Sequence, residues 1–160
     1  GGPCTNGLES TIIDCSGANP VLLRLGGISR IAIETALHSA GLDCPLRDAH
    51  ALSDSDQPVA PGQLQSHYAP AASVRLNATS QQGDEELIGF GSVPGAGQLS
   101  LSLSPAGNIR EAATNLFAML HQADAVTTGT ERKIAIAPIP KTGIGEAIND
   151  RLQRAAAPRV

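Results

Sequence analysis

The stretch from residue 46 to residue 71 divides this chain of 160 residues into two unequal parts. It contains three prolines and the run Asp54-Ser55-Asp56-Gln57, and its apolar residues follow neither a helical nor a strand period. Such a segment is typical of a linker. We therefore predict three parts: a remnant of one domain over residues 1–45, a linker over 46–71, and a second domain over 72–160.

The first part carries signals for two strands and one helix. The strands are expected over residues 10–15 and 21–25, on either side of a turn-forming segment. Ser29 is placed to cap the helix and Gly41 to end it, with an apolar face made of Ile33, Ala36, Leu37 and Ala40. This piece is too small to close a core alone. Because the chain begins with Gly1 instead of methionine, we expect it to be a processed or truncated fragment.

In the second part, strands alternate with helices. Short strands are expected over residues 73–76, 87–90, 99–103 and 133–137. One helix begins at Asn108, with Glu111 in the position of a capping box, and a last helix runs from about residue 146 to 157. Aromatic residues make up only 2% of the chain, so Ala, Leu, Ile and Val must build the core. The alternation predicts an α/β domain, Rossmann-like and three-layered, with a mostly parallel sheet.

Charge and hydropathy exclude several classes of function. The net charge is −4 and the basic residues are scattered, which argues against a tight nucleic-acid binder. No apolar run approaches the roughly 20 residues that span a bilayer. The three cysteines have no C-x-x-C spacing, which argues against a zinc site and a disulfide framework. We expect a soluble, cytoplasmic protein.

Side chains on two segments of the first part are candidates for binding a ligand. Ser10 and its neighbour Thr11 lie where a glycine-containing loop enters a strand, a position that can direct hydroxyls at a small polar ligand. The alternative is that both residues only form the hydrogen bonds and the cap of the strand. Arg24 lies between leucines, and a guanidinium there suits a phosphate. A salt bridge from Arg24 to Asp14 or Glu9 is the alternative.

The end of the linker carries the only tyrosine of the chain, Tyr68, next to His67. Pro61 and Pro70 stiffen this segment and favour an extended strap. A tyrosine can bury its ring and still use its hydroxyl as a hydrogen-bond donor, which suits a strap that closes over a ligand. The alternative is that Tyr68 only attaches the linker to a domain surface.

Four motifs resemble the C-terminal half of the two-domain threonylcarbamoyl-AMP synthases, the YrdC-like family with a C-terminal accessory domain. They are, in order, G-L-E-S-T-I-I-D (residues 7–14), L-L-R-x-G-G (22–27), P-G-x-x-x-S-H-Y-A-P (61–70) and G-x-G-x-A-x-x-x-R-L-x-R-A-A (143–156). The first three follow the order and spacing of the family. The last motif fits a helix start better than a dinucleotide-binding fingerprint, because Ile148 stands where the fingerprint has Gly or Ala.

The resemblance implies an enzyme, a nucleotidyltransferase that joins L-threonine, bicarbonate and ATP into threonylcarbamoyl-AMP and pyrophosphate for a tRNA modification. It implies that Ser10 contacts L-threonine, Arg24 the nucleotide phosphates and Tyr68 the nucleotide, with Thr11 and His67 as further candidates. Mg²⁺ would accompany ATP. The other expected partner is the upstream, N-terminal part of the catalytic domain, whereas tRNA contact should be indirect or weak and no membrane is involved.

Two departures from the family qualify this interpretation. Leu25 stands where the family usually has proline, which loosens a turn but keeps the guanidinium. The upstream part of the catalytic domain, with most of the nucleotide and threonine sites, is not in this sequence, so this chain alone should be inactive. The competing hypothesis is a non-catalytic α/β binding or regulatory module.

Overall fold

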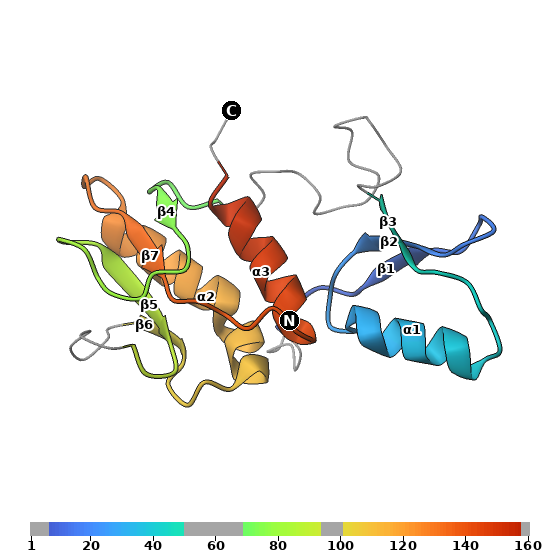
Figure 1. Ribbon diagram of the computed structural model, residues 1–160. Coiled ribbons are helices and arrows are strands. Elements are labelled where there is room, and N and C mark those ends of the chain that lie inside the picture. The colour runs from blue at the N-terminus through green and yellow to red at the C-terminus, as the bar shows by residue number, and fades with distance from the viewer. Residues whose placement is uncertain (1–6, 50–68, 94–100, 158–160) are drawn as a thin grey trace.

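The computed structural model describes residues 7–49, 69–93 and 101–157, and these ranges contain two separate sheets (Figure 1). The first sheet has the order β1-β2-β3. β1 (Ile12–Asp14) pairs antiparallel with β2 (Val21–Arg24), and β2 pairs parallel with β3 (Arg47–Asp48). The helix α1 (Arg30–Ser39) connects β2 to β3 and lies along this small sheet.

The second sheet contains four parallel strands in the order β4-β7-β5-β6. These strands are β4 (Val74–Arg75), β5 (Glu86–Phe90), β6 (Leu101–Ser104) and β7 (Ile134–Ile136). The helix α2 (Ile109–Thr127) follows β6, and α3 (Ile144–Ala155) follows β7. The predicted α/β class and the mostly parallel sheet are therefore confirmed.

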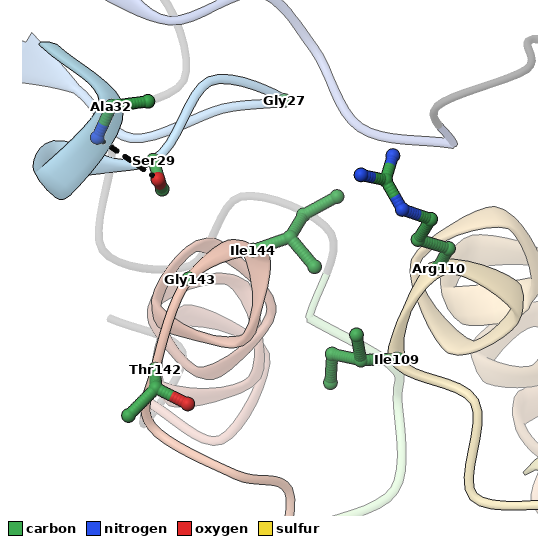
Figure 2. Close-up of a pocket in the computed structure, with 8 residues that line it drawn as sticks. All are labelled: Gly27, Ser29, Ala32, Ile109, Arg110, Thr142, Gly143 and Ile144. Carbon is green, nitrogen blue, oxygen red and sulfur yellow. Dashed lines mark hydrogen bonds between the residues drawn. The ribbon is translucent and has the colours of Figure 1, made fainter.

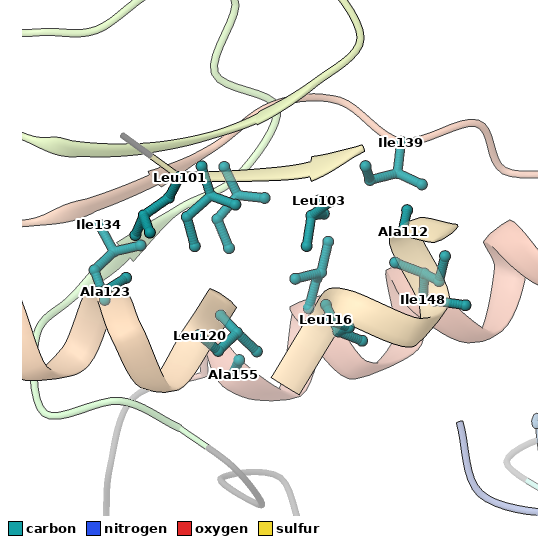
Figure 3. Packing of buried hydrophobic residues seen from close by; sticks show 14 of the residues in the cluster. Leu101, Leu103, Ala112, Leu116, Leu120, Ala123, Ile134, Ile139, Ile148 and Ala155 are labelled. Atoms are coloured by element: carbon teal, nitrogen blue, oxygen red, sulfur yellow. The ribbon is translucent and has the colours of Figure 1, made fainter. Parts of the chain in front are cut away.

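The core of the second sheet lies between its strands and the two long helices (Figure 3). Successive strand residues point to opposite faces of a sheet. Ile88, Ile134 and Ile136 accordingly face the helices, while Leu87 and Ala135 belong to a smaller cluster. The helices contribute a continuous row of small and branched side chains to the main core, from Ala112, Leu116, Leu120, Ala123, Ile148, Leu152 and Ala155. The predicted N-cap of α2 is present, since the Asn108 side chain accepts hydrogen bonds from Arg110 N and Glu111 N. The second half of the predicted capping box is replaced, because Asn108 N donates to Ser104 Oγ and Ser104 Oγ donates to Glu111.

The apolar face expected for α1 is only partly correct. Ile33 is buried and Leu37 packs against it, but Ala36 and Ala40 are exposed. Ile31 on the same helix is 60% exposed. The reason is the size of the first sheet: its cluster consists of Leu22, Ile33 and Leu46 with a few flanking residues, and three short strands cover a single row of the helix.

The two sheets are joined by the chain that precedes β1. Leu8 is buried in the core of the second sheet, although it lies only four residues before β1. Gly7 has a φ of +62°, and a Cβ at this position would stand 2.2 Å from the backbone oxygen of Ala113 in α2. Only glycine therefore allows the chain to pass this close to α2.

The division into three parts stays a prediction, because residues 50–68 lie outside the described ranges. β3 falls inside the range expected to be linker and was not foreseen as a strand. Within the described part of the chain, no helix is both long enough and apolar enough to cross a membrane.

Candidate functional site

Arg24 and Ser10, the two candidates in the first part, contact each other. The antiparallel pairing of β1 with β2 places Arg24 opposite Ile12, so its side chain reaches the residues that enter β1. Arg24 Nε donates a hydrogen bond to the Ser10 carbonyl oxygen at 3.1 Å, and Nη2 donates to Ser10 Oγ at 3.2 Å. The structure thus brings a hydroxyl and a guanidinium together at the end of a short hairpin.

The neighbours of Ser10 are fixed by contacts with the loop after β2. Gly27 N donates to the Glu9 carbonyl oxygen at 3.2 Å. Thr11 Oγ1 donates to the Ile28 carbonyl oxygen at 2.8 Å and accepts from Ile28 N at 3.1 Å. The hydroxyl of Thr11 therefore bridges two loop segments, while Ser10 meets Arg24.

The carboxylates considered as ion-pair partners of Arg24 have other contacts. Asp14 accepts a hydrogen bond from Ser16 N at 2.9 Å, and hydrogen bonds from the Ser16 backbone and side chain lower the pKa of Asp14. Glu9 accepts from Arg151 Nε at 2.9 Å. The two bonds from Arg24 described above go to Ser10, a neutral residue.

Arg151 is a residue of this site that sequence reasoning missed. It lies in α3 and is only 2% exposed. Besides the Nε bond to Glu9, its Nη2 donates to the Leu25 carbonyl oxygen at 2.8 Å. One signal could have revealed it: Arg151 follows Ile148 by three residues and precedes Ala155 by four, so the helical period places it on the buried face.

A pocket lies beside this site, between the first sheet's helix and the starts of α2 and α3 (Figure 2). Its volume is about 370 Å³. The side chain of Ile144 points from α3 toward the space between the Gly27 loop and Arg110. The lining residues are Gly27, Ser29, Ala32, Ile109, Arg110, Thr142, Gly143 and Ile144. Neither Ser10 nor Arg24 lines this pocket.

The remaining candidates, Tyr68 and His67, lie outside the described residues, so the expected strap stays a prediction. Among the residues that the structure describes, no three His, Cys, Asp or Glu side chains are grouped so that they could hold a metal ion.

Residues 28–157 match the sequence model of the threonylcarbamoyl-AMP synthase, C-terminal domain. The chain belongs to this family. The match covers most of the chain and confirms the resemblance inferred from the motifs.

Two curated members of the family are similar over the whole chain. The threonylcarbamoyl-AMP synthase of Bacillus subtilis is 32% identical over 174 aligned residues, which cover 100% of this chain and 48% of the relative. The threonylcarbamoyl-AMP synthase of Pyrococcus abyssi is 29% identical, covering 100% of this chain and 49% of the relative. This chain therefore spans about half the length of the curated relatives it matches.

Solved structures of the same family have the same fold. The crystal structure of P. abyssi Sua5 complexed with L-threonine matches with a TM-score of 0.70 and 27% sequence identity, over 95% of this chain and 46% of that chain. A structure of P. abyssi Sua5 with a histidine and the next residue, a tyrosine, replaced by alanine matches equally well.

Proposed function

We propose that the full-length protein is a threonylcarbamoyl-AMP synthase and that this chain supplies part of its substrate site. The reaction joins L-threonine, bicarbonate and ATP. One N–C bond forms between the amine and the bicarbonate carbon with loss of water, and an oxygen of the resulting carbamate bonds to the α-phosphorus of ATP as the P–O bond to pyrophosphate breaks. The products are threonylcarbamoyl-AMP, pyrophosphate and water. The adenylate would feed a tRNA modification in the cytoplasm.

The contact between Ser10 and Arg24 is the observation that carries this proposal. A hydroxyl next to a guanidinium suits a site where an amino acid and a nucleotide meet, because the hydroxyl can bind the polar groups of L-threonine while the cation faces phosphate. Arg24 would also stabilise the charge that develops on the phosphates during attack at the α-phosphorus. The L-threonine bound to P. abyssi Sua5 supports threonine as the amino acid.

Tyr68 would contact the nucleotide from the segment before the second sheet. His67 and Tyr68 form the only His-Tyr pair of this chain, and a pair of the same residue types was replaced in the solved P. abyssi variant. A strap that excludes water would protect the product, since a mixed anhydride is readily hydrolysed.

Mg²⁺ enters this proposal as part of the MgATP substrate. The phosphate oxygens of ATP would supply part of its octahedral coordination, and water would complete much of the rest. Bound in this way, Mg²⁺ would neutralise charge on the leaving pyrophosphate.

The test is pyrophosphate release by the full-length gene product with MgATP. Release that requires both L-threonine and bicarbonate supports the synthase. Release that needs neither substrate, or no release from a folded protein, contradicts it and favours a binding or regulatory module.

A Tyr68→Phe change separates the same two functions at the strap. We expect the variant to keep its fold and to lose affinity for ATP, because the hydroxyl is the only group removed. Unchanged ATP affinity would indicate that Tyr68 serves only to dock the linker. Isothermal titration with a non-hydrolysable ATP analogue measures the difference.

A further inference from the structure

We propose that Arg151 in α3 is a positioning residue that holds the Ser10 and Arg24 side chains in the relative position that binds their substrates. The inference rests on the proposed function and goes beyond it, because it assigns the accessory domain a role at the substrate site. Arg151 lies outside the first sheet and acts through two neighbouring segments of it.

The contacts of Arg151 fall next to the two candidate residues in the sequence. Its Nε and Nη2 both lie 2.9 Å from Glu9 Oε2, and Glu9 immediately precedes Ser10. Its Nη2 also donates to the carbonyl oxygen of Leu25, which immediately follows Arg24. One guanidinium therefore joins both chain segments from which the Ser10–Arg24 pair is built.

The sheet alone does not fix these segments. β1 begins at Ile12 and β2 ends at Arg24, so Ser10 and Leu25 lie beyond the ends of the paired strands. The pairing also shifts register between Ile12 and Ile13. Besides the backbone bond from Gly27 N to the Glu9 carbonyl oxygen, side-chain bonds therefore position Ser10, and the bond from Arg151 to Glu9 comes from α3, which packs on the second sheet.

The core beside the second sheet holds this contact in place. Arg151 is 2% exposed, and its Nη1 donates to Asp150, which also binds Arg154. Leu8, one residue before Glu9, is buried in the core of the second sheet. A buried guanidinium is costly unless its donors are satisfied, so Glu9 and Leu25 cannot move away from it without a penalty.

Arg75 provides a matched control within the second domain. It donates from Nε and Nη2 to both Glu85 oxygens at 3.0 and 2.6 Å, and from Nη2 to the Ser80 carbonyl oxygen at 3.0 Å. Arg151 likewise binds one carboxylate and one carbonyl, in addition to its bond to Asp150, whereas the bonds of Arg75 join no residue of the first sheet. Arg75→Met should therefore disturb the domain without reaching Ser10.

The experiment compares Arg151→Met with Arg75→Met in the full-length protein by steady-state pyrophosphate release. We expect Arg151→Met to raise KM for L-threonine about tenfold, with a smaller change in kcat. The reason is that a displaced Ser10 weakens the binding of L-threonine more than it slows the chemical step. Arg75→Met should leave KM within about twofold of the wild type. Arg151→Lys should restore KM only in part, since an ammonium cannot reach two acceptors as a planar fork does.

Glu9→Gln keeps the experiment decisive if Arg151→Met does not fold. It should raise KM in the same direction, and the double variant should lie within about twofold of the more affected single variant, because both changes remove one interaction. Hydrogen exchange gives a readout independent of catalysis. Amides of residues 9–13 and 24–28 should exchange faster in Arg151→Met and not in Arg75→Met.

The outcomes separate the two proposals. Equal KM values for Arg151→Met, Glu9→Gln and the wild type, with an active wild type, overturn the positioning role and leave the synthase intact. A wild type that releases no pyrophosphate overturns the synthase, and the positioning role falls with it. Unchanged hydrogen exchange in Arg151→Met also contradicts the role, whatever the activity.

Discussion

Arg24 donates hydrogen bonds to both oxygens of Ser10, the carbonyl at 3.1 Å and the hydroxyl at 3.2 Å. Fourteen residues separate the pair in the chain, and the β1-β2 hairpin brings them together. The Ser10 hydroxyl can donate its own hydrogen to a ligand while it accepts one from Arg24. We therefore expect a substitution of Ser10 to weaken binding of L-threonine and a substitution of Arg24 to weaken binding of ATP.

For Ser10→Ala, we expect KM for L-threonine to rise roughly five- to tenfold in the full-length protein, with the fold retained. The variant loses one hydrogen bond to the substrate, and the bond from Arg24 to the Ser10 carbonyl remains. Steady-state pyrophosphate release at varied L-threonine measures the change. Ser16→Ala, at the far end of β1, is the matched control, and an equal effect in both variants would contradict the role of Ser10.

Arg24→Lys tests the nucleotide side of the site. A lysine keeps the charge but cannot present two parallel donors to a phosphate, so we expect kcat/KM for ATP to fall about 10- to 100-fold. The same substitution at Arg47, which is exposed on β3, should have little effect. If both variants keep wild-type kcat/KM, Arg24 does not bind the phosphates.

Gly26→Ala should displace the backbone of the segment that carries Ser10. A Cβ at Gly26 would stand 2.3 Å from the Glu9 carbonyl oxygen and 2.4 Å from Thr11 N, so the segment around Ser10 has to move. We expect a loss of about 1–3 kcal/mol in the free energy of unfolding together with weaker threonine binding.

Gly17→Ala is the control for this change, because the nearest atom to its Cβ would be the Asn19 carbonyl oxygen at 3.8 Å. Urea unfolding and calorimetric titration of L-threonine measure both effects. Equal stability of the two alanine variants would show that the loop after β2 can relax away from residues 9–11.

Glu85 should make part of the stability around the second sheet dependent on pH. Hydrogen bonds from the Arg75 side chain, with a further one from Gln82 N, lower the pKa of this carboxyl in the folded state. Since the unfolded chain has the ordinary value of about 4.3, the pair stabilises the fold above that pH. Its contribution is lost as the pH falls through the lower, folded value.

Glu85→Gln measures this contribution. The variant should be less stable than the wild type at pH 7, and the difference should shrink as the pH drops below about 4. Glu131→Gln, in the exposed loop before β7, controls for the change in net charge. Thermal unfolding between pH 7 and 3 records both curves, and a difference independent of pH would exclude the Glu85 ionisation as its cause.

Much of the local structure could be read from the sequence. Asn108 caps α2 as its side chain predicted, and the alternating strands and helices indicated a parallel sheet correctly. These features depend on neighbouring residues and on periodicity, which are present in the chain itself. The face of α1 was harder to predict, because burial depends on how much sheet lies against the helix.

Ser10 and Arg24 could be named from the sequence as candidates, since residue type and motif are enough to suggest their chemistry. Their hydrogen bonds to each other, and the contacts of Arg151 with Glu9 and Leu25, could not be named in the same way. Arg151 lies 142 residues from Glu9 along the chain. Local sequence patterns do not predict a contact between residues so far apart in the chain. Only the packing of α3 and the anchoring of Leu8 in the second core bring this guanidinium to the first sheet, because burial forces its donors to find acceptors there.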